Sequence, residues 1–302
     1  MKDTTIGSMK IKNKPNGFEV SFTSPYPQTT VKELLEEYLL IPRKIRHFLR
    51  TKKHLRINNE LVNWQSPVKT GDNISLFFDQ DDYPLKDIPK GDAALVDCLY
   101  EDDHLIVVNK VEGMKSHGNA PGEIALLNHV SAYIGQTAYI IHRLDMETSG
   151  AIVFAKNPFI LPIMNQLLEK RQIHREYWAL VDGHLEQKDL TYRQAIGRHR
   201  SDRRKRVVDL KNGQRAITHV SRLKSYANKQ TLINCQLDTG RTHQIRVHLS
   251  YNGHPIVGDP LYHKFSSSRL MLHAHRLSFT HPLTLKKMSL EATSQTFENG
   301  LP

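Results

Sequence analysis

The sequence predicts an α+β protein with a mixed, largely antiparallel central sheet and flanking helices, preceded by a small N-terminal α/β domain. Three observations lead to this prediction. Residues 15–80 alternate short helical and strand patterns, residues 81–94 are acidic and lack periodicity, and residues 95–302 are rich in strand patterns with few helices between them. We therefore expect an N-terminal extension over residues 1–14, a small domain over 15–80, a linker over 81–94 and a larger domain over 95–302.

The small domain begins with two helical patterns. Thr29 or Thr30 can cap the first helix, and the second helix is expected to start at Pro42. The apolar face of the second helix is surrounded by basic side chains: Arg43, Lys44, Arg46, Arg50, Lys52 and Lys53. A strand, an Asn-Asn turn and a second strand follow over residues 54–64, and a Gly-Asp turn precedes the last strand. This core is too small to be very stable, which is typical of an accessory module.

The larger domain consists mainly of strands. Apolar or alternating runs predict two strands around an acidic turn at residues 94–110, and further strands at 151–156, 175–181, 216–223 and 231–238. Helical spacing predicts helices over residues 121–134, 157–172 and 241–253, the last of which ends at Gly253. This mixture favours a largely antiparallel α+β sheet.

The net charge limits the possible partners. The 302 residues include 42 Lys and Arg against 31 Asp and Glu, which gives a net charge of +11. Such an excess favours a polyanionic partner, either nucleic acid or an acidic membrane surface. No run approaches the roughly 20 apolar residues that span a bilayer, and the N-terminus lacks the apolar core of a signal peptide. Cys98 and Cys235 form no C-x-x-C pair, which suits a reducing compartment. We therefore expect a cytoplasmic protein that binds nucleic acid and not membrane.

The densest basic stretch lies between two predicted strands, at residues 197–206, and includes Arg203, Arg204 and Arg206. A loop of this composition either contacts phosphate groups or remains solvated. With the basic helix of the small domain, it provides two candidate surfaces for a nucleic-acid backbone.

The segment Tyr139–Asn157 combines an apolar run with an isolated arginine and an isolated aspartate. We expect a strand in which Arg143 and Asp145 point to the same side, because side chains alternate along a strand. A polar turn at residues 147–150 follows and exposes Asp145 to whatever lies above the strand end. In the alternative interpretation, Asp145 only caps this turn.

A second polar segment offers a partner for this carboxylate. In the helix predicted over residues 241–253, Ile245 and Leu249 form an apolar stripe, and Arg246 lies at its edge. A half-buried arginine needs a carboxylate partner, and Asp145 is one candidate. The alternative is a surface arginine of which only the aliphatic stem is packed.

Several other chemistries lack their usual motifs here. The sequence contains no H-E-x-x-H, no clustered cysteines and histidines, no G-x-S-x-G and no P-loop. An aspartyl phosphatase stays open as an alternative, with Asp145 as nucleophile and Glu147 as a second carboxylate at magnesium. Glycoside hydrolysis needs paired carboxylates, and only Asp145 has a suitable setting.

The stretch HRLDMETSG, residues 142–150, resembles the H-R-L-D-x-x-T-S-G signature of the RluA family of RNA pseudouridine synthases. Further segments resemble family motifs in the same order: DHLIVVNKVEGMKSH, HREYWALVDG, LDTGRTHQIRVHL with GHPIVGDPLY, and LMLHAHRLSFTHP. Val111 stands where the family usually has proline, and Arg175 stands where it has lysine. The resemblance covers residues 95–285. More loosely, the small N-terminal domain resembles the αL-type RNA-binding module of a ribosomal protein and of tyrosyl-tRNA synthetases.

The resemblance implies a pseudouridine synthase fold and the isomerisation of uridine to pseudouridine in structured RNA. The family modifies ribosomal RNA most often and transfer RNA in some members. The glycosidic bond breaks, the uracil turns in the site, and its C5 atom joins C1′ of the ribose. No cofactor or metal ion is expected, because no bond energy need be supplied from outside. We expect the protein to act as a monomer.

Matching positions imply roles for individual residues. Asp145 matches the family's catalytic aspartate, which acts either at the ribose C1′ or as a base at C2′. Tyr177 matches the residue that packs on the uracil and is placed for proton transfer, and Arg246 matches the residue that pairs with the aspartate. Arg143 matches the residue that helps fill the position left by the extruded uridine. Further substrate-binding positions are expected at His142, Thr148, Arg241, His243 and Gln244.

Two functions from different classes fit these motifs. The first is a catalytic pseudouridine synthase with an appended RNA-binding module. The second is a non-catalytic RNA-binding or ribosome-assembly protein that has kept the fold. The presence of Asp145, Tyr177 and Arg246 together favours the first.

Overall fold

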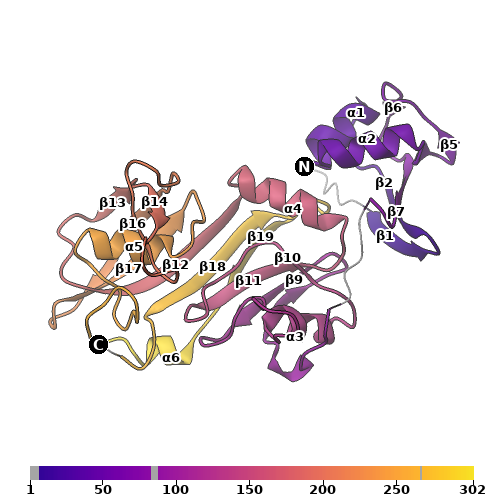
Figure 1. The fold of residues 1–302 in the computed structure, drawn as a ribbon. Coiled ribbons are helices and arrows are strands. Elements are labelled where there is room, and N and C mark those ends of the chain that lie inside the picture. Colours follow the sequence, from indigo (N-terminus) through magenta and orange to yellow (C-terminus); the bar gives the residue numbers. More distant parts are fainter. Residues whose placement is uncertain (1–6, 83–87, 266) are drawn as a thin grey trace. The chain divides into compact units, whose positions relative to one another are not determined.

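The computed structural model describes residues 7–82, 88–265 and 267–302 (Figure 1). The chain forms two compact units. The first comprises residues 1–88, 155–172 and 279–288, and the second comprises residues 89–154, 173–278 and 289–302. The expected extension and linker include residues 1–6 and 83–87, which lie outside the described residues.

A five-stranded antiparallel sheet forms the framework of the first unit, in the order β1-β2-β7-β4-β5. Its strands are β1 (Gly7–Lys14), β2 (Gly17–Thr23), β4 (Leu55–Ile57), β5 (Glu60–Leu61) and β7 (Asn73–Asp79). A short separate pair joins β3 (Thr29–Thr30) to β6 (Pro67–Val68). Because β1 pairs along β2, residues 7–14 belong to this sheet and do not form an extension.

The helices of the first unit follow the predicted pattern. They are α1 (Val31–Glu33), which continues into a π-helical turn (Leu34–Tyr38), α2 (Arg43–Thr51) and α4 (Ile160–Glu169). Thr30 caps α1: its hydroxyl accepts the Glu33 N–H, and the Glu33 carboxylate accepts the Thr30 N–H. This reciprocal pair satisfies two backbone donors that the helix itself leaves unpaired.

The second unit contains a ten-stranded sheet with the order β13-β16-β17-β12-β18-β11-β9-β8; β10 pairs with β11, and β19 with β18. The strands are β8 (Cys98–Glu101), β9 (Leu105–Lys110), β10 (Tyr139–Ile140), β11 (Ser149–Ala155), β12 (Ile173–Asp182), β13 (Asp189–Tyr192), β16 (Thr218–Ser225), β17 (Gln230–Leu237), β18 (Leu272–Thr280) and β19 (Lys287–Glu291). The β11–β18 pair is parallel, whereas β8–β9, β12–β17, β13–β16 and β16–β17 are antiparallel. The prediction of a mixed, largely antiparallel sheet is confirmed.

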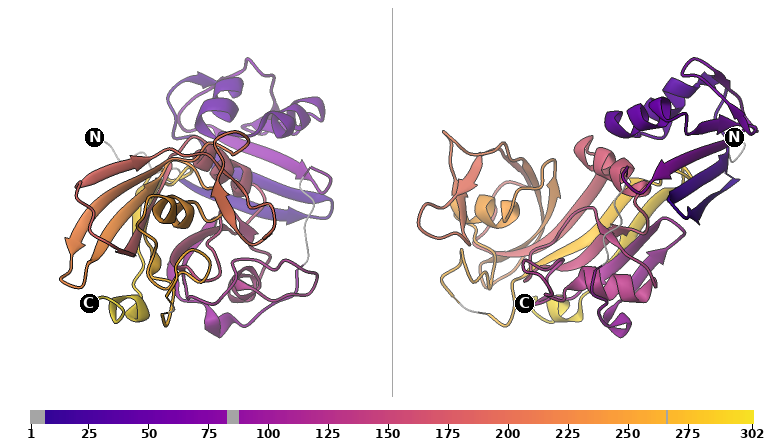
Figure 2. Two further views of the ribbon diagram at one scale, coloured as in Figure 1. Left: turned by 60° about the vertical axis from the view of Figure 1, so that its left-hand side comes forward. Right: turned by 45° about the vertical axis from the view of Figure 1, so that its right-hand side comes forward.

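Helices and a separate hairpin complete the second unit. They are a 3₁₀ turn (Ala93–Leu95), α3 (Leu126–Tyr133), α5 (Gln244–Tyr251), α6 (Gln295–Glu298), and a two-stranded hairpin of β14 (Ile196–Arg198) and β15 (Arg206–Val208). Figure 2 shows α5 beside the strands of the β16–β17 region, and it contacts both β15 and β16. No helix in the described ranges is both long enough and apolar enough to cross a membrane.

The end of the expected linker is bound to the second unit. The Asn128 side-chain amide donates to the Pro89 carbonyl at 2.6 Å, and the Asp92 N–H donates to His129 Nδ1 at 2.9 Å. Residues 89–92 are therefore tied to α3, although Pro89, Lys90 and Asp92 are exposed, so this end of the predicted linker is solvated but hydrogen-bonded to the second unit.

The expected strand through Arg143 and Asp145 is also wrong. Residues 141–148 form a loop between β10 and β11. The Ser116 hydroxyl accepts the Leu144 N–H at 3.0 Å and donates to the Leu144 carbonyl at 2.7 Å. A side chain thus satisfies the backbone groups that a neighbouring strand would otherwise bind.

A steric constraint explains why the residue at position 150, after this loop, is glycine. Gly150 has φ +115°, and a Cβ atom there would lie 2.2 Å from the Ala274 carbonyl oxygen. The close approach of β11 to β18 therefore requires glycine at this position.

Candidate active site

The Asp145 carboxylate contacts the Arg246 guanidinium. Asp145 lies in the loop before β11, and Arg246 lies in the first turn of α5. Arg246 Nη1 donates to Asp145 Oδ2 at 3.2 Å. The Arg246 side chain is only 1% exposed, whereas that of Asp145 is 21% exposed. The pair therefore presents its carboxylate to solvent and keeps its cation inside.

A second carboxylate, Asp259, holds the other side of the guanidinium. Arg246 Nε donates to Asp259 Oδ2 and Arg246 Nη2 donates to Asp259 Oδ1, each at 2.8 Å. Asp259 Oδ1 also accepts the backbone N–H groups of Leu261 and Tyr262. The sequence analysis missed Asp259. The signal was available, because Asp259 is the one carboxylate in the GHPIVGDPLY segment and follows Arg246 closely.

The charge of Arg246 is stabilised by its neighbours. Burial acts to lower its pKa, but the hydrogen bonds and charge of Asp259 and the charges of Asp145 and Glu147 outweigh burial and raise the pKa above its ordinary value. Glu147 Oε2 lies 3.6 Å from Arg246 Nη1. Arg246 is therefore a permanent cation that lies beside the Asp145 carboxylate.

Tyr177 faces the same site from β12. The residue is 5% exposed and lies opposite Cys235 of β17. Burial raises the pKa of its hydroxyl; the positive charge of Arg175 opposes this effect, and the negative charge of Asp145 adds to it. The phenol is therefore protonated at neutral pH, and its coupling to Asp145 places both groups in one site.

A buried lysine, Lys110, binds backbone carbonyls in and near the loop that carries Asp145. Lys110, at the end of β9, is 1% exposed, and its Nζ donates to the carbonyls of Val111, Met114 and Met146. The Gly113 N–H also donates to the Met146 carbonyl, at 2.8 Å. The residue after Asp145 is thus fixed by two donors. Val111, which stands where the family usually has proline, preserves this arrangement because only its backbone carbonyl bonds to Lys110.

Lys110 was also missed by the sequence analysis. Its signal was a single lysine at the end of the apolar run LIVVNK. Burial lowers its pKa to about 8, although the charges of Asp145, Glu147 and Glu112 oppose that shift. The ammonium form therefore still predominates at neutral pH and adds a second buried positive charge near the Asp145 loop.

The other candidate residues of the signature at residues 142–150 differ from one another in exposure and in hydrogen-bond partners. Arg143 is exposed, and its Nη2 donates to the Thr242 hydroxyl at 3.0 Å. His142 is buried, its Nε2 accepts the Val153 N–H, and burial, with the charge of Arg175, lowers its pKa to about 3. Thr148 is buried, and its N–H closes a turn onto the Asp145 carbonyl. Of these three side chains, only that of Arg143 is placed on the surface.

The residues at the start of α5 that are predicted to bind substrate also differ in their exposure and their hydrogen-bond partners. Gln244 is 3% exposed, and its amide group bonds to Thr239, Arg241, Ile217 and Thr218. Arg241 is exposed, and its guanidinium donates to the Gln214 side chain and the Arg215 carbonyl. His243 Nε2 lies 3.8 Å from Asp145 Oδ2. His243 therefore belongs to the Asp145 site, whereas Gln244 holds the loop that precedes α5.

The basic residues of α2 divide into two groups. Arg46 pairs with Glu36, and Lys52 Nζ donates to Asp79 at 2.6 Å and Asp82 at 2.7 Å. The others have exposed side chains: Arg43, Lys44, Arg50 and Lys53. Only this second group presents unneutralised charge to a phosphate backbone.

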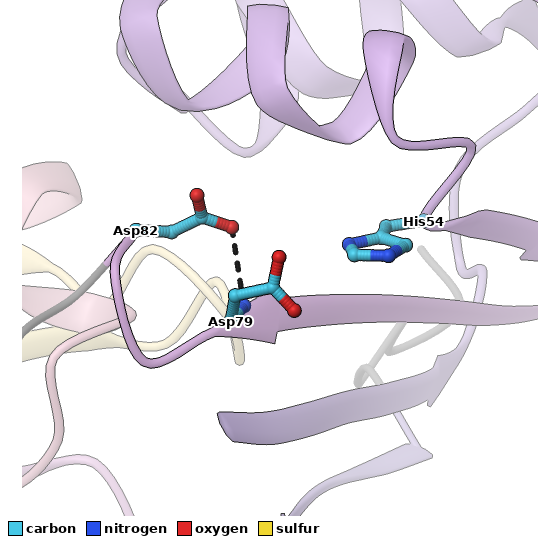
Figure 3. Close-up of side chains that lie close together, drawn as sticks. All are labelled: His54, Asp79 and Asp82. Carbon is cyan, nitrogen blue, oxygen red and sulfur yellow. Dashed lines mark hydrogen bonds between the residues drawn. The ribbon is translucent and has the colours of Figure 1, made fainter. Parts of the chain in front are cut away.

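One group of possible metal ligands occurs among the described residues, at His54, Asp79 and Asp82 (Figure 3). The Lys52 ammonium contacts both carboxylates, and the Asp79 N–H donates to Asp82 at 3.1 Å. The cluster is thus neutralised by a cation of the protein itself, and its geometry is explained without a metal ion.

The predicted basic loop forms the tip of the β14–β15 hairpin. At this tip Arg203 is exposed, Arg204 pairs with Asp202 at 3.2 Å, and Arg206 Nη1 donates to the Arg203 and Lys205 carbonyls. Arg203 is therefore the arginine of this set with the most accessible charge.

Comparisons with known proteins agree with this arrangement. Residues 104–251 match the family described as RNA pseudouridylate synthase, and residues 18–74 match the RluD ribosomal pseudouridine synthase N-terminal domain. The solved structure of human RNA pseudouridylate synthase domain containing 1 superposes with a TM-score of 0.58 at 26% identity, over 68% of this chain and 86% of that one. The fold is therefore that of a pseudouridine synthase.

Two relatives define the family more closely. The uncharacterized RNA pseudouridine synthase YhcT of Bacillus subtilis is 35% identical over 93% of this chain and 95% of its own length. The ribosomal large subunit pseudouridine synthase D of Nitrosomonas europaea is 41% identical over 64% of this chain and 60% of its own length. The chain belongs to the RluA family of RNA pseudouridine synthases, as its motifs predicted.

We predict that Asp259→Asn destabilises the protein by roughly 3–5 kcal/mol, the usual loss when one partner of a buried ion pair is removed. The asparagine would present an N–H group to one of the two Arg246 donors. Unfolding by urea measures this loss, and Asp103→Asn, at an exposed carboxylate, is the control. A loss below about 1 kcal/mol, as for a surface pair, would contradict the assignment of Asp259 as the support of Arg246.

Proposed function

We propose that this protein isomerises uridines of ribosomal RNA to pseudouridine, with Asp145 as the reacting carboxylate. The observation that carries this proposal is the placement of Asp145, a partly exposed carboxylate held through one oxygen by a buried guanidinium. The ribosomal substrate is supported by the named relatives and by the match of residues 18–74 to the N-terminal domain of a ribosomal pseudouridine synthase.

The geometry supports a division of roles. Arg246 holds the Asp145 carboxylate in place through Nη1, so that the carboxylate can act at the ribose, either at C1′ or as a base at C2′. Tyr177 offers an apolar ring face for uracil and a protonated hydroxyl for proton transfer. After the N1–C1′ glycosidic bond breaks, the uracil turns and C5 bonds to C1′; the C5 proton is then lost and N1 takes up a proton, so the composition is unchanged. Because the product is an isomer of the substrate, we propose that the protein uses no metal ion or cofactor. We also propose that it acts in the cytoplasm as a monomer.

The residues around Asp145 are proposed to act in two ways. Arg143, on the surface next to Thr242, takes the role of supporting the extruded uridine. His142, Thr148 and Gln244 are proposed to position the loops rather than to touch substrate, because all three are buried and bond to neighbouring groups of the protein.

We predict that Asp145→Asn folds and binds RNA but forms almost no pseudouridine. The substitution keeps the side-chain shape and removes its charge and nucleophilic character. Single-turnover assays on ribosomal RNA fragments measure the product, and circular dichroism checks the fold. Activity within about tenfold of wild type, a difference of about 1.4 kcal/mol, would exclude Asp145 as the reacting group.

The small domain is predicted to bind RNA through the exposed basic residues of α2. Replacing Arg50 and Lys53 with alanine should weaken RNA binding and reduce the salt dependence of log K by roughly one unit per lost phosphate contact. Lys52→Ala is the matched control, because Lys52 already pairs with Asp79 and Asp82. Equal salt slopes for wild type and the double variant would show that this face of α2 does not contact the backbone.

Arg143 is predicted to matter more on folded RNA than on unfolded RNA. Unstacking a base in a structured site costs a few kcal/mol, and a guanidinium can stack on the neighbouring bases better than an ammonium. Arg143→Ala should therefore slow single-turnover reaction on a stem-loop much more than on a short unstructured RNA, and Arg143→Lys should restore little. The same fractional loss on both RNAs would assign Arg143 a purely electrostatic role.

A further inference from the structure

A continuous series of polar contacts joins the basic hairpin to Asp145. The backbone N–H of Arg206, in β15, donates to the Tyr262 hydroxyl oxygen at 2.8 Å. That hydroxyl lies 3.0 Å from His243 Nδ1, and His243 Nε2 lies 3.8 Å from Asp145 Oδ2. These contacts connect Arg206, Tyr262 and His243, which belong to three separate segments of the chain, to the carboxylate of Asp145 that is proposed to react.

The direction of these hydrogen bonds follows from the first of them. A backbone N–H can only donate, so the Tyr262 oxygen accepts from Arg206. The hydroxyl hydrogen of Tyr262 is then available to His243 Nδ1, and the arrangement in which Nδ1 accepts it uses this hydrogen. Burial lowers the pKa of His243, although the charge of Asp145 opposes that shift. A neutral ring whose Nδ1 accepts must carry its hydrogen on Nε2, and Nε2 is the atom that faces Asp145.

The surroundings hold Tyr262 in place. Its ring packs with Val208 of the hairpin against the small apolar cluster of Ile196, Ala216 and Val247. The same ring lies edge-on to His243, at a centroid distance of 5.8 Å and an interplanar angle of 82°. The Arg246 guanidinium lies over it at 5.4 Å. Tyr262 thus contacts both groups that approach Asp145.

The backbone of His243 supports a functional position for its ring. His243 precedes α5 with φ +57° and ψ +23°, a left-handed conformation that is uncommon for a residue other than glycine. Backbone strain of this kind occurs where the surroundings force a side chain into a required position. Here the strain turns the imidazole between Tyr262 and Asp145.

Both donors approach the same oxygen of Asp145. Arg246 Nη1 and His243 Nε2 each lie nearest to Oδ2, and within the described residues no hydrogen bond or ion pair reaches Oδ1. The Arg246 hydrogen bond fixes the orientation of the carboxylate, the His243 ring lies beside the same oxygen at 3.8 Å, and the other oxygen is left to the substrate.

We propose that Tyr262 is a positioning residue that fixes His243 as an Nε2–H donor beside Asp145 Oδ2, so that Oδ1 is the oxygen presented to the ribose. This inference rests on the proposed function for its effect on turnover. The hydrogen-bond assignment itself concerns the free protein and requires no substrate.

The test compares Tyr262→Phe with wild type in two measurements. Phenylalanine keeps the ring and its packing but removes the hydroxyl. Nitrogen NMR of ¹⁵N-histidine-labelled protein, with the His243 signals assigned from their loss in His243→Gln, reports which ring nitrogen carries hydrogen. We expect the wild-type ring to carry it on Nε2 and the variant ring to populate both tautomers.

In the second measurement kcat should fall about tenfold in Tyr262→Phe, the scale of one neutral hydrogen bond, while the RNA dissociation constant changes by less than about twofold. Tyr251→Phe, at an exposed tyrosine on α5, is the matched control and should match wild type. His243→Gln, which retains a side-chain N–H donor, should keep more activity than His243→Ala.

Either of two results would overturn the proposal: an unchanged kcat in Tyr262→Phe, or a His243 ring that keeps its hydrogen wholly on Nε2 without the Tyr262 hydroxyl. If wild-type protein forms no pseudouridine, the proposed function fails. The tautomer measurement in the free protein still decides the role of Tyr262 in that case.

Discussion

The buried Arg246 guanidinium is the charge on which the site depends. Removing a guanidinium from water is unfavourable by several kcal/mol unless its donors are paired with good geometry. Asp259 provides that geometry with two bonds of 2.8 Å, and two backbone N–H groups hold Asp259 in turn. The remaining nitrogen, Nη1, is then directed at Asp145. Through Arg246, the buried carboxylate of Asp259 thus determines where the carboxylate of Asp145 is held.

The loop that carries Asp145 is supported by side chains and not by a strand. Ser116 bonds both backbone groups of Leu144, and Lys110 with the Gly113 N–H binds the Met146 carbonyl. Asp145 lies between these two fixed residues. A strand would have placed Arg143 and Asp145 on one face, whereas the loop leaves Arg143 exposed and turns Asp145 towards Arg246. This separation fits the proposed roles, in which Arg143 contacts the RNA and Asp145 acts at the ribose.

The positive charge of the chain is less available to RNA than its sequence indicates. Arg46 and Lys52 are neutralised within the small domain, and Arg204 pairs with Asp202 in the hairpin. Only exposed cations without a carboxylate partner release counterions on binding phosphate. The number of cations available to RNA is therefore smaller than the 42 Lys and Arg of the sequence.

Much of the fold and of the site could be predicted from sequence, because local patterns depend on neighbouring residues. The helices of the small domain, the Thr30 cap and six strands of the large sheet (β8, β9, β11, β12, β16 and β17) follow from apolar spacing and capping chemistry, whereas β13, β18 and β19 were not predicted. Residue types made Asp145 one candidate partner for Arg246, and the resemblance to the family implied the pair that the structure shows. The tertiary structure decided what depends on segments distant in sequence. It placed Asp259 and Tyr262 against α5, Lys110 beneath Met146, and Gln244 inside the protein. Burial and partners set the role of a polar side chain, and both arise only when the sheet brings those segments together.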